Sequence, residues 1–320
     1  GKGFAPWVAA LIREREAAGI LTLKAAAQKA AASLRDMGVG LVGEISTLGI
    51  TRQMMHTRGQ AGVWFKEYLG DEQEYLRHEQ EYLGDEKKGL YLKKQDPLSF
   101  SAAGHGPHTT APKLLTALKQ STRAAGLVFS IHVAESDVEK DFIAGTRSGW
   151  TDFLASRGID TTAWPVGNKT PVAYLHDLGV LDSATLAVHL LHVTDRDLDI
   201  LARTGTKLCL CPRSNQNLHG ILPDIASILS RNLAPALGTD SLASCDSLDI
   251  FDEMAFVRQC YPQISLPDIL AMATVHGATA LGLGDHWGTL DTGRSARFLY
   301  LDITARTPAE VMEKVTAYGI

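Results

Sequence analysis

Short apolar segments alternate with longer amphipathic segments along most of the chain. The short segments are rich in β-branched and apolar residues and have the length of buried strands, whereas the longer ones repeat apolar positions at helical spacing. This alternation is typical of βα units arranged around a parallel sheet. The pattern predicts seven strands, at residues 39–44, 62–66, 98–103, 127–132, 185–190, 206–211 and 234–239.

Helices are predicted between and after these strands. Pro112, Pro171 and Pro223 stand near predicted helix starts, where a missing backbone N–H matters least. Thr194, with Asp197 three residues later, has the spacing of a capping box. The predicted helices cover residues 5–18, 22–36, 111–125, 137–145, 170–178, 194–203, 223–231, 246–259, 265–274 and 306–316.

Seven parallel strands of this rhythm fit a (β/α)8 TIM-type barrel that lacks one strand better than they fit an open sheet. The sequence opens on a helical pattern, GKGFAPWVAALIRERE, so the lacking strand is the first. A barrel without one strand has two unpaired edges. We therefore expect an α/β fold whose barrel covers residues 1–285, and a native protein that continues upstream of Gly1.

Residues 67–87 consist of a seven-residue unit repeated in tandem: EYLGDEQ, EYLRHEQ and EYLGDEK. Three units, interrupted by Gly70 and Gly84, are too few for a coiled coil. We interpret this segment as an insertion after a barrel strand with a solvated acidic face. A partner-binding arm is the alternative, and His78 is expected to be a surface histidine.

Composition and charge narrow the possible partners and location. The 320 residues carry a formal net charge of −5, with no clustering of basic residues. Such a chain offers no basic field for nucleic acid or an anionic membrane, and it has no apolar run long enough to span a bilayer. The four cysteines lack CxxC spacing and are interpreted as free thiols. A cytoplasmic protein with a small-molecule substrate is the resulting expectation.

Candidate catalytic residues lie at the ends of the predicted strands, where (β/α) barrels place their chemistry. His105, His132 and His189 end or follow three of the strands, and Asp240 follows the last. His189 is expected to point inward from its strand, whereas His192 lies in the following turn.

The segment FSIHVAES, residues 129–136, is the most informative of these strand ends. His132 offers a neutral nitrogen ligand at the end of a rigid strand. Glu135, three residues later, is close enough to exchange a proton with a water on a metal. A core histidine followed by a surface glutamate is the alternative interpretation.

Asp240, in ALGTDSLAS, either caps the next helix or binds a metal. Ser241, Ser244 and Asp246 lie nearer the helix predicted from about Ser247 and are better placed to cap it. This comparison favours a functional role for Asp240.

Several motifs together resemble the amidohydrolase superfamily, in its aminohydrolase and chlorohydrolase branch. The branch includes S-adenosylhomocysteine deaminase, guanine deaminase and aminofutalosine deaminase-like proteins. The similarity covers residues from about 95 to 300. The segment GTLDTGRSARFLYLD is similar to the part of the family's chain that returns to a small β domain, so residues 286–320 are expected to form this return and a final helix. The matching segments are GHGPHTTAP (104–112), IHVAES (131–136), VHLLHVTD (188–195), CPRSN (211–215), LHGILP (218–223), GTDSLASCDSLDIFDEM (238–254) and ATVHGATALGL (273–283).

The resemblance implies a role for each candidate. His132 and Asp240 are implied metal ligands, and Asp240 also hydrogen-bonds the hydrolytic water. Glu135 is implied to shuttle a proton to the leaving ammonia, and His189 to orient the water. The implied substrate-binding residues are His105, His108, which replaces a tyrosine of the family, and Ser214 and Asn215.

The family's HxH ligand pair is absent from all 320 residues. Either the pair lies upstream of Gly1, which the unclosed barrel favours, or this member has lost its metal site. We expect a hydrolase with a divalent metal, zinc or iron, that deaminates a nucleobase, nucleoside or related N-heterocycle. The alternatives are a dehalogenase of a triazine-like ring and a catalytically silent binding protein. The resemblance also suggests a homodimer.

Overall fold

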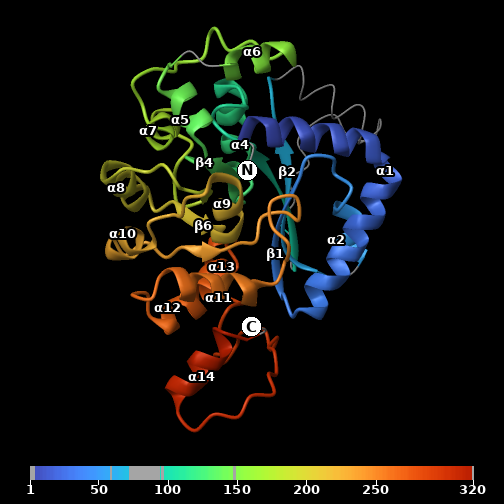
Figure 1. The fold of residues 1–320 in the computed structure, drawn as a ribbon, viewed down its shortest axis with the longest axis vertical. Coiled ribbons are helices and arrows are strands. Elements are labelled where there is room, and N and C mark those ends of the chain that lie inside the picture. Colours follow the sequence, from blue (N-terminus) through green and yellow to red (C-terminus); the bar gives the residue numbers. More distant parts are fainter. Residues whose placement is uncertain (1–3, 58–59, 72–93, 95–96, 147–148, 319–320) are drawn as a thin grey trace.

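The computed structural model describes residues 4–57, 60–71, 94, 97–146 and 149–318. Within them, seven parallel strands form one curved sheet in sequential order, as expected for a (β/α) barrel (Figure 1). All seven predicted strands are confirmed. Their bounds are β1 Leu41–Ser46, β2 Ala61–Tyr68, β3 Leu98–Gly104, β4 Phe129–Val133, β5 Thr185–His189, β6 Lys207–Leu210 and β7 Ala236–Leu237.

The helices follow the predicted order with a few additions. Helix α1 covers both helices predicted before the first strand, and Gly19 interrupts it with a non-helical φ of 71°. Helices α2, α6, α9 and α13 were not predicted. The bounds are α1 Phe4–Asp36, α2 Arg52–Thr57, α4 Pro112–Ala124, α5 Asp137–Ile143, α6 Gly149–Ser156, α7 Pro171–Asp177, α8 Asp195–Thr204, α9 Pro212–His219, α10 Ile225–Ser230, α11 Ile250–Cys260, α12 Leu266–Ala273, α13 Val275–Ala280 and α14 Pro308–Val315.

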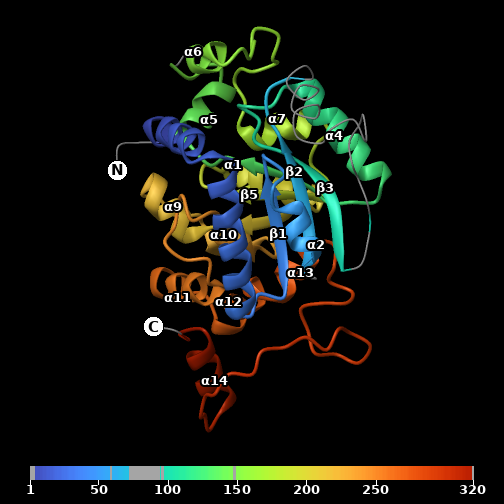
Figure 2. The same ribbon diagram turned by 90° about the vertical axis from the view of Figure 1, so that its right-hand side faces the viewer.

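The parallel register places the carboxyl ends of the strands at one edge of the sheet. Apolar side chains of the strands, among them Phe129, Ile131, Leu208 and Leu210, are almost fully buried in the main core. Helix α14 and the segment before it extend from one end of the molecule, opposite α5 and α6 (Figures 1 and 2). The strand ends that carry the candidate residues therefore extend from this buried core.

Helix capping agrees with the sequence at α8 and differs at α11. The Thr194 hydroxyl accepts the Asp197 backbone N–H, and the Asp197 carboxylate accepts that of Thr194, so the capping box is confirmed. Helix α11 begins at Ile250, later than predicted, and its cap is Asp249, whose carboxylate accepts the Phe251 N–H at 2.9 Å. The prediction of a cap from Ser241, Ser244 or Asp246 was wrong, because the loop after β7 continues to Asp249. Within this loop the Ser244 hydroxyl and the Cys245 thiol donate hydrogen bonds to the Ser241 carbonyl.

Two of the predicted domain features are only partly within the described residues. Glu67 and Tyr68, the first residues of the predicted insertion, belong to β2 and are buried, which contradicts a solvated face there. Residues 72–87, with His78, lie outside the described residues. Residues 286–307 are described and contain no strand. This segment alone does not test the predicted return to a small β domain, which stays a prediction. No helix in the described ranges is long and apolar enough to cross a membrane.

A buried ion pair joins α4 to the turn before β5. Nζ of Lys119 lies 2.5 Å from Oδ1 of Asp182, and the lysine side chain is 3% exposed against 30% for the aspartate. We expect Lys119→Met to lower the free energy of unfolding by about 2–3 kcal/mol, below the usual range for a fully buried pair, because Asp182 keeps some contact with water. Urea unfolding measures this change. The matched control is Lys113→Met on the same helix, where the lysine is exposed, and equal midpoints for the two variants would contradict the expectation.

Candidate active site

Three histidines from neighbouring strands meet at the carboxyl edge of the sheet. His105 follows β3, His132 lies on β4, and His189 ends β5. The ring centroids of His105 and His132 are 5.2 Å apart, and those of His132 and His189 are 5.3 Å apart. The structure therefore brings together the three histidines that the sequence singled out.

The orientation of His132 is fixed by a backbone carbonyl. Its Nδ1 lies 2.7 Å from the carbonyl oxygen of His105, which can only accept, so Nδ1 carries the proton and Nε2 keeps a lone pair. Burial lowers the pKa of His132, but the charges of Glu67, Glu135 and Asp240 outweigh it and hold the pKa above its ordinary value. A ring oriented in this way is suited to ligate a metal through Nε2.

His189 is held in the same manner by a side chain from α9. Its Nδ1 lies 2.9 Å from Oδ1 of Asn215, and both side chains are buried. The amide oxygen accepts, so Nδ1 donates and Nε2 faces the site. That nitrogen lies 3.7 Å from Oε1 of Glu135.

Glu135 is a buried carboxyl between two histidines. Nε2 of His219 lies 3.3 Å from the same oxygen, Oε1, that His189 approaches. Burial raises the pKa of Glu135, but His189, the hydrogen bond from His219 and the nearby His132 outweigh it and hold the pKa below its ordinary value. The carboxylate form is thus favoured in the absence of a reacting partner.

A second buried carboxyl, that of Glu139, holds the backbone of the turn that carries Glu135. Glu139 accepts the backbone N–H groups of Ala134 at 2.7 Å and Glu135 at 2.8 Å. Burial nevertheless raises the pKa of Glu139 to about 8. These two bonds fix the backbone from which the Glu135 side chain extends.

Backbone strain concentrates at the same strand ends. Four non-glycine residues there have positive φ: Ala134 (54°), His189 (80°), Leu190 (60°) and Asp240 (58°). Two asparagines account for the other positive values among the non-glycine residues described, and asparagine tolerates that conformation better. Strained backbone retained at clustered polar side chains is typical of functional sites.

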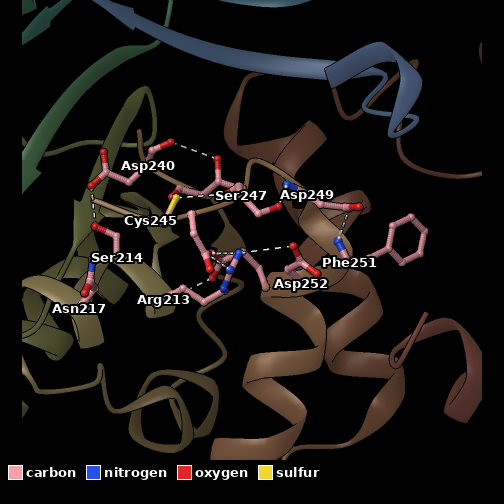
Figure 3. Close-up of polar contacts among 12 residues, drawn as sticks. Arg213, Ser214, Asn217, Asp240, Cys245, Ser247, Asp249, Phe251 and Asp252 are labelled. Carbon is pink, nitrogen blue, oxygen red and sulfur yellow. Dashed lines mark hydrogen bonds and ion pairs between the residues drawn. The ribbon is translucent and has the colours of Figure 1, made fainter. Parts of the chain in front are cut away.

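Asp240 emerges from β7 and is oriented by two hydroxyl groups. Its Oδ2 accepts Ser214 Oγ at 2.6 Å and Ser244 Oγ at 2.8 Å. Figure 3 shows the Ser214 hydroxyl directed toward the Asp240 carboxylate. Asp240 caps no helix, in agreement with its expected functional role, and its charge acts on His132 across the site.

The first turn of α9 connects two of these strand ends. Ser214 reaches Asp240 after β7, and Asn215 reaches His189 on β5. Arg213 pairs with Asp246. Its Nη1 also lies 3.6 Å from an Asp252 oxygen (Figure 3). This turn therefore sets the relative positions of the side chains on both sides of the site.

The residues after β3 form a buried segment that carries polar side chains. His105 Nδ1 lies 2.7 Å from Thr109 Oγ1. His108 is 1% exposed, and neither of its ring nitrogens has a hydrogen-bond partner among the described residues. Its ring packs 5.4 Å from that of Trp150, and burial lowers its pKa to about 3. His108 is thus a neutral ring with one donor and one acceptor to offer.

Two buried residues of the site were missed in the sequence. Glu67, at the end of β2, accepts a hydrogen bond from Thr47 Oγ1 at 2.5 Å. Its position after the apolar run GVWFK was a usable signal, but the tandem repeat that begins there concealed it. His219 lies within the segment LHGILP, and no local pattern distinguished it from a surface residue.

The donor chemistry of the cluster fits a divalent metal. Ligand atoms of Glu67, His105 and His132 lie within 4.8 Å of one another, all on the described strands β2 to β4 or directly after them. Asp240, oriented by its two serines, adds a further carboxylate near His132. Imidazole and carboxylate together suit zinc, iron or manganese.

Two deaminases are among the known proteins to which the chain is similar. The chain is 31% identical over 274 residues to aminodeoxyfutalosine deaminase of Deinococcus radiodurans, covering 83% of this chain and 64% of that protein. It is 31% identical over 206 residues to 5-methylthioadenosine/S-adenosylhomocysteine deaminase of Moorella thermoacetica, covering 62% of this chain and 44% of that protein. The chain thus spans less than two thirds of either relative.

Solved structures share the fold. Helicobacter pylori aminofutalosine deaminase superposes with a TM-score of 0.80 at 22% identity, over 99% of this chain and 78% of that one. Atrazine chlorohydrolase from Arthrobacter aurescens TC1, complexed with zinc, gives 0.74 at 17% identity, over 97% and 73%. The profile of the Amidohydrolase family matches residues 13–319. The resemblance identified in the sequence is therefore confirmed, and the chain belongs to the amidohydrolase family.

Proposed function

We propose that the protein is a metal-dependent hydrolytic deaminase of an amino-substituted nucleobase, nucleoside or related N-heterocycle. The observation that carries the proposal is the position of Glu135, buried three residues after the candidate ligand His132 and flanked by His189 and His219. The deaminase relatives support the same reaction class. Removal of an amino group from a cyclic amidine requires a water nucleophile and a residue that moves protons, and this cluster can supply the second.

The metal would be held by His132 through Nε2 and by Asp240, with ligands beyond these two required for a catalytic zinc. A divalent metal lowers the pKa of bound water from 15.7 to about 7, which makes hydroxide available at neutral pH. Glu67 is the nearest described candidate for a further oxygen donor, since it groups with His105 and His132.

The protein's own side chains carry the proton transfers. The favoured carboxylate form of Glu135 can accept a proton from water. Glu135 delivers this proton to the ring nitrogen as the water oxygen bonds to the ring carbon. It then takes the second proton of that water from the hydroxyl group of the adduct and delivers it to the amine, which leaves as ammonia when the C–N bond breaks. His189 presents Nε2 to the same region, since Asn215 fixes its Nδ1–H, and it orients the nucleophile.

Substrate contacts are proposed for His105, His108, Ser214 and Asn215. Within the part of the chain that the structure describes, the two ring nitrogens of His108 and the buried Nδ2 of Asn215 have no hydrogen-bond partner. These atoms are available to a heterocycle that both donates and accepts hydrogen bonds. Ser214 acts mainly through Asp240, to which its hydroxyl is bonded. The homodimer and the cytoplasmic location stay predictions.

The zinc-loaded full-length protein should release ammonia from at least one member of a panel of adenosine derivatives, and removal of the metal by a chelator should abolish the release. Ammonia is measured in a coupled assay, with zinc added back as the control. A triazine chloride belongs in the panel because the chlorohydrolase structure shares this fold. Chloride release alone would favour the dehalogenase alternative, and no release of either product would favour a binding protein.

A further inference from the structure

His219 lies within the family-like segment LHGILP, but neither that resemblance nor the strand-end pattern assigned it a role. It is the last residue of α9, followed by Gly220, whose φ of 69° ends the helix. Its side chain is 7% exposed, so the fold directs the imidazole into the molecule rather than into solvent. There the imidazole contacts the side chain of Glu135, 84 positions earlier in the chain.

We propose that His219 is a positioning residue for the proton shuttle of the proposed deaminase, holding the Glu135 carboxyl through an Nε2–H hydrogen bond to Oε1. This inference rests on the proposed function. His219 keeps its own proton throughout. The proton that moves passes from water to Glu135 and from Glu135 to the substrate nitrogen, so His219 acts through the carboxyl.

The geometry around Glu135 explains why such a residue is needed. The backbone of the Glu135 turn is anchored by Glu139, whereas the Glu135 carboxyl itself contacts the side chains of the two histidines among the described residues. Of these, His189 lies at 3.7 Å, beyond hydrogen-bond distance, whereas His219 lies at 3.3 Å. His219 therefore provides the closer restraint on the side chain that must swing between water and substrate.

Titratable side chains on several elements surround the pair of Glu135 and His219. On the inner side, the charges of His132, His105 and His108 act on or respond to that of Glu135. On the outer side, Asp137 and His192 lie within 3.9 Å of each other, and both respond to His219. Glu139 lies beneath the turn. None of these described groups donates a hydrogen bond to the Glu135 carboxyl, so none of them replaces the bond that is lost with His219.

The test compares His219→Ala with His219→Gln in the zinc-loaded full-length protein. Loss of a hydrogen bond to a charged group corresponds to about a 10-fold to 100-fold lower kcat for the alanine variant, with KM changed less than about threefold. The Gln amide can donate to the same oxygen, so kcat should return to within a few-fold of wild type. His176→Ala, at a partly exposed histidine of α7, is the control and should behave as wild type.

The same variants are examined without turnover by a ¹³C NMR titration of the Glu135 carboxyl in the metal-free protein, with the resonance assigned by its absence in Glu135→Gln. The pKa of Glu135 should rise in His219→Ala and return toward wild type in His219→Gln. An unchanged titration in His219→Ala would overturn the positioning role, even if wild-type protein released no ammonia. If the titration shifts and the wild type is inactive, the positioning role stands and the proposed deaminase activity fails.

Discussion

Glu135→Gln should lower kcat by about 10²-fold to 10⁴-fold while leaving the fold and the metal content unchanged. Glutamine has nearly the shape of glutamate and can still accept a hydrogen bond from His219, so the restraint on the side chain is kept. It cannot accept a proton from water or deliver one to the ring nitrogen and the departing amine. Ammonia release under saturating substrate measures the loss.

The design separates proton transfer from binding and folding. Since Glu135 acts in the transition state, kcat and kcat/KM should fall together, with a small change in KM. Glu313→Gln, at an exposed position of α14, is the charge-matched control and should retain wild-type rates. Full turnover by Glu135→Gln with an equal zinc content would show that another group moves the proton.

Strands β2 to β5 were predictable because they are buried almost throughout, which favours a continuous run of apolar and small residues. The signal also survives in the less buried β1 and β6, and in the short β7 at Ala236–Leu237. Helix α9 was not predicted. It follows β6 without a capping side chain, and its sequence PRSNQNLH is mostly polar. Its position is decided by tertiary bonds from Arg213, Ser214 and Asn215, which no local pattern reports.

The site residues also divide into those that a local sequence signal marks and those that only tertiary contacts place. His132, Glu135, His189 and Asp240 could be identified because barrel strands deliver polar residues at their carboxyl ends. His219 could not, because it reaches Glu135 through a helix that follows another strand, and only the folded chain shows the 3.3 Å approach. The start of the α11 helix was misplaced for a related reason, since Ser244 and Cys245 bond within the loop that delays it.

Asp240→Asn should reduce both zinc content and ammonia release, with activity lowered by about 10³-fold or more if Asp240 is a ligand that also orients the nucleophile. The substitution keeps the size of the side chain but removes the charge that acts on His132. It also replaces one carboxylate oxygen by an NH₂ group, which accepts no hydrogen bond and binds no cation. The single remaining oxygen can either receive the Ser214 and Ser244 hydroxyls or face the metal, but cannot do both as the carboxylate does.

Ser244→Ala provides a graded comparison because it removes one of those hydroxyls and leaves the carboxylate in place. Loss of such a supporting bond should weaken zinc binding by about 10-fold to 100-fold, so activity should recover when zinc is added in excess. Asp240→Asn should not recover in this way. The control is Asp285→Asn, at an exposed position away from the α9 turn, and we expect wild-type zinc content there. Equal zinc affinity in Asp240→Asn and Asp285→Asn would remove Asp240 from the ligand set and leave it as a residue that orients Ser214 and Ser244.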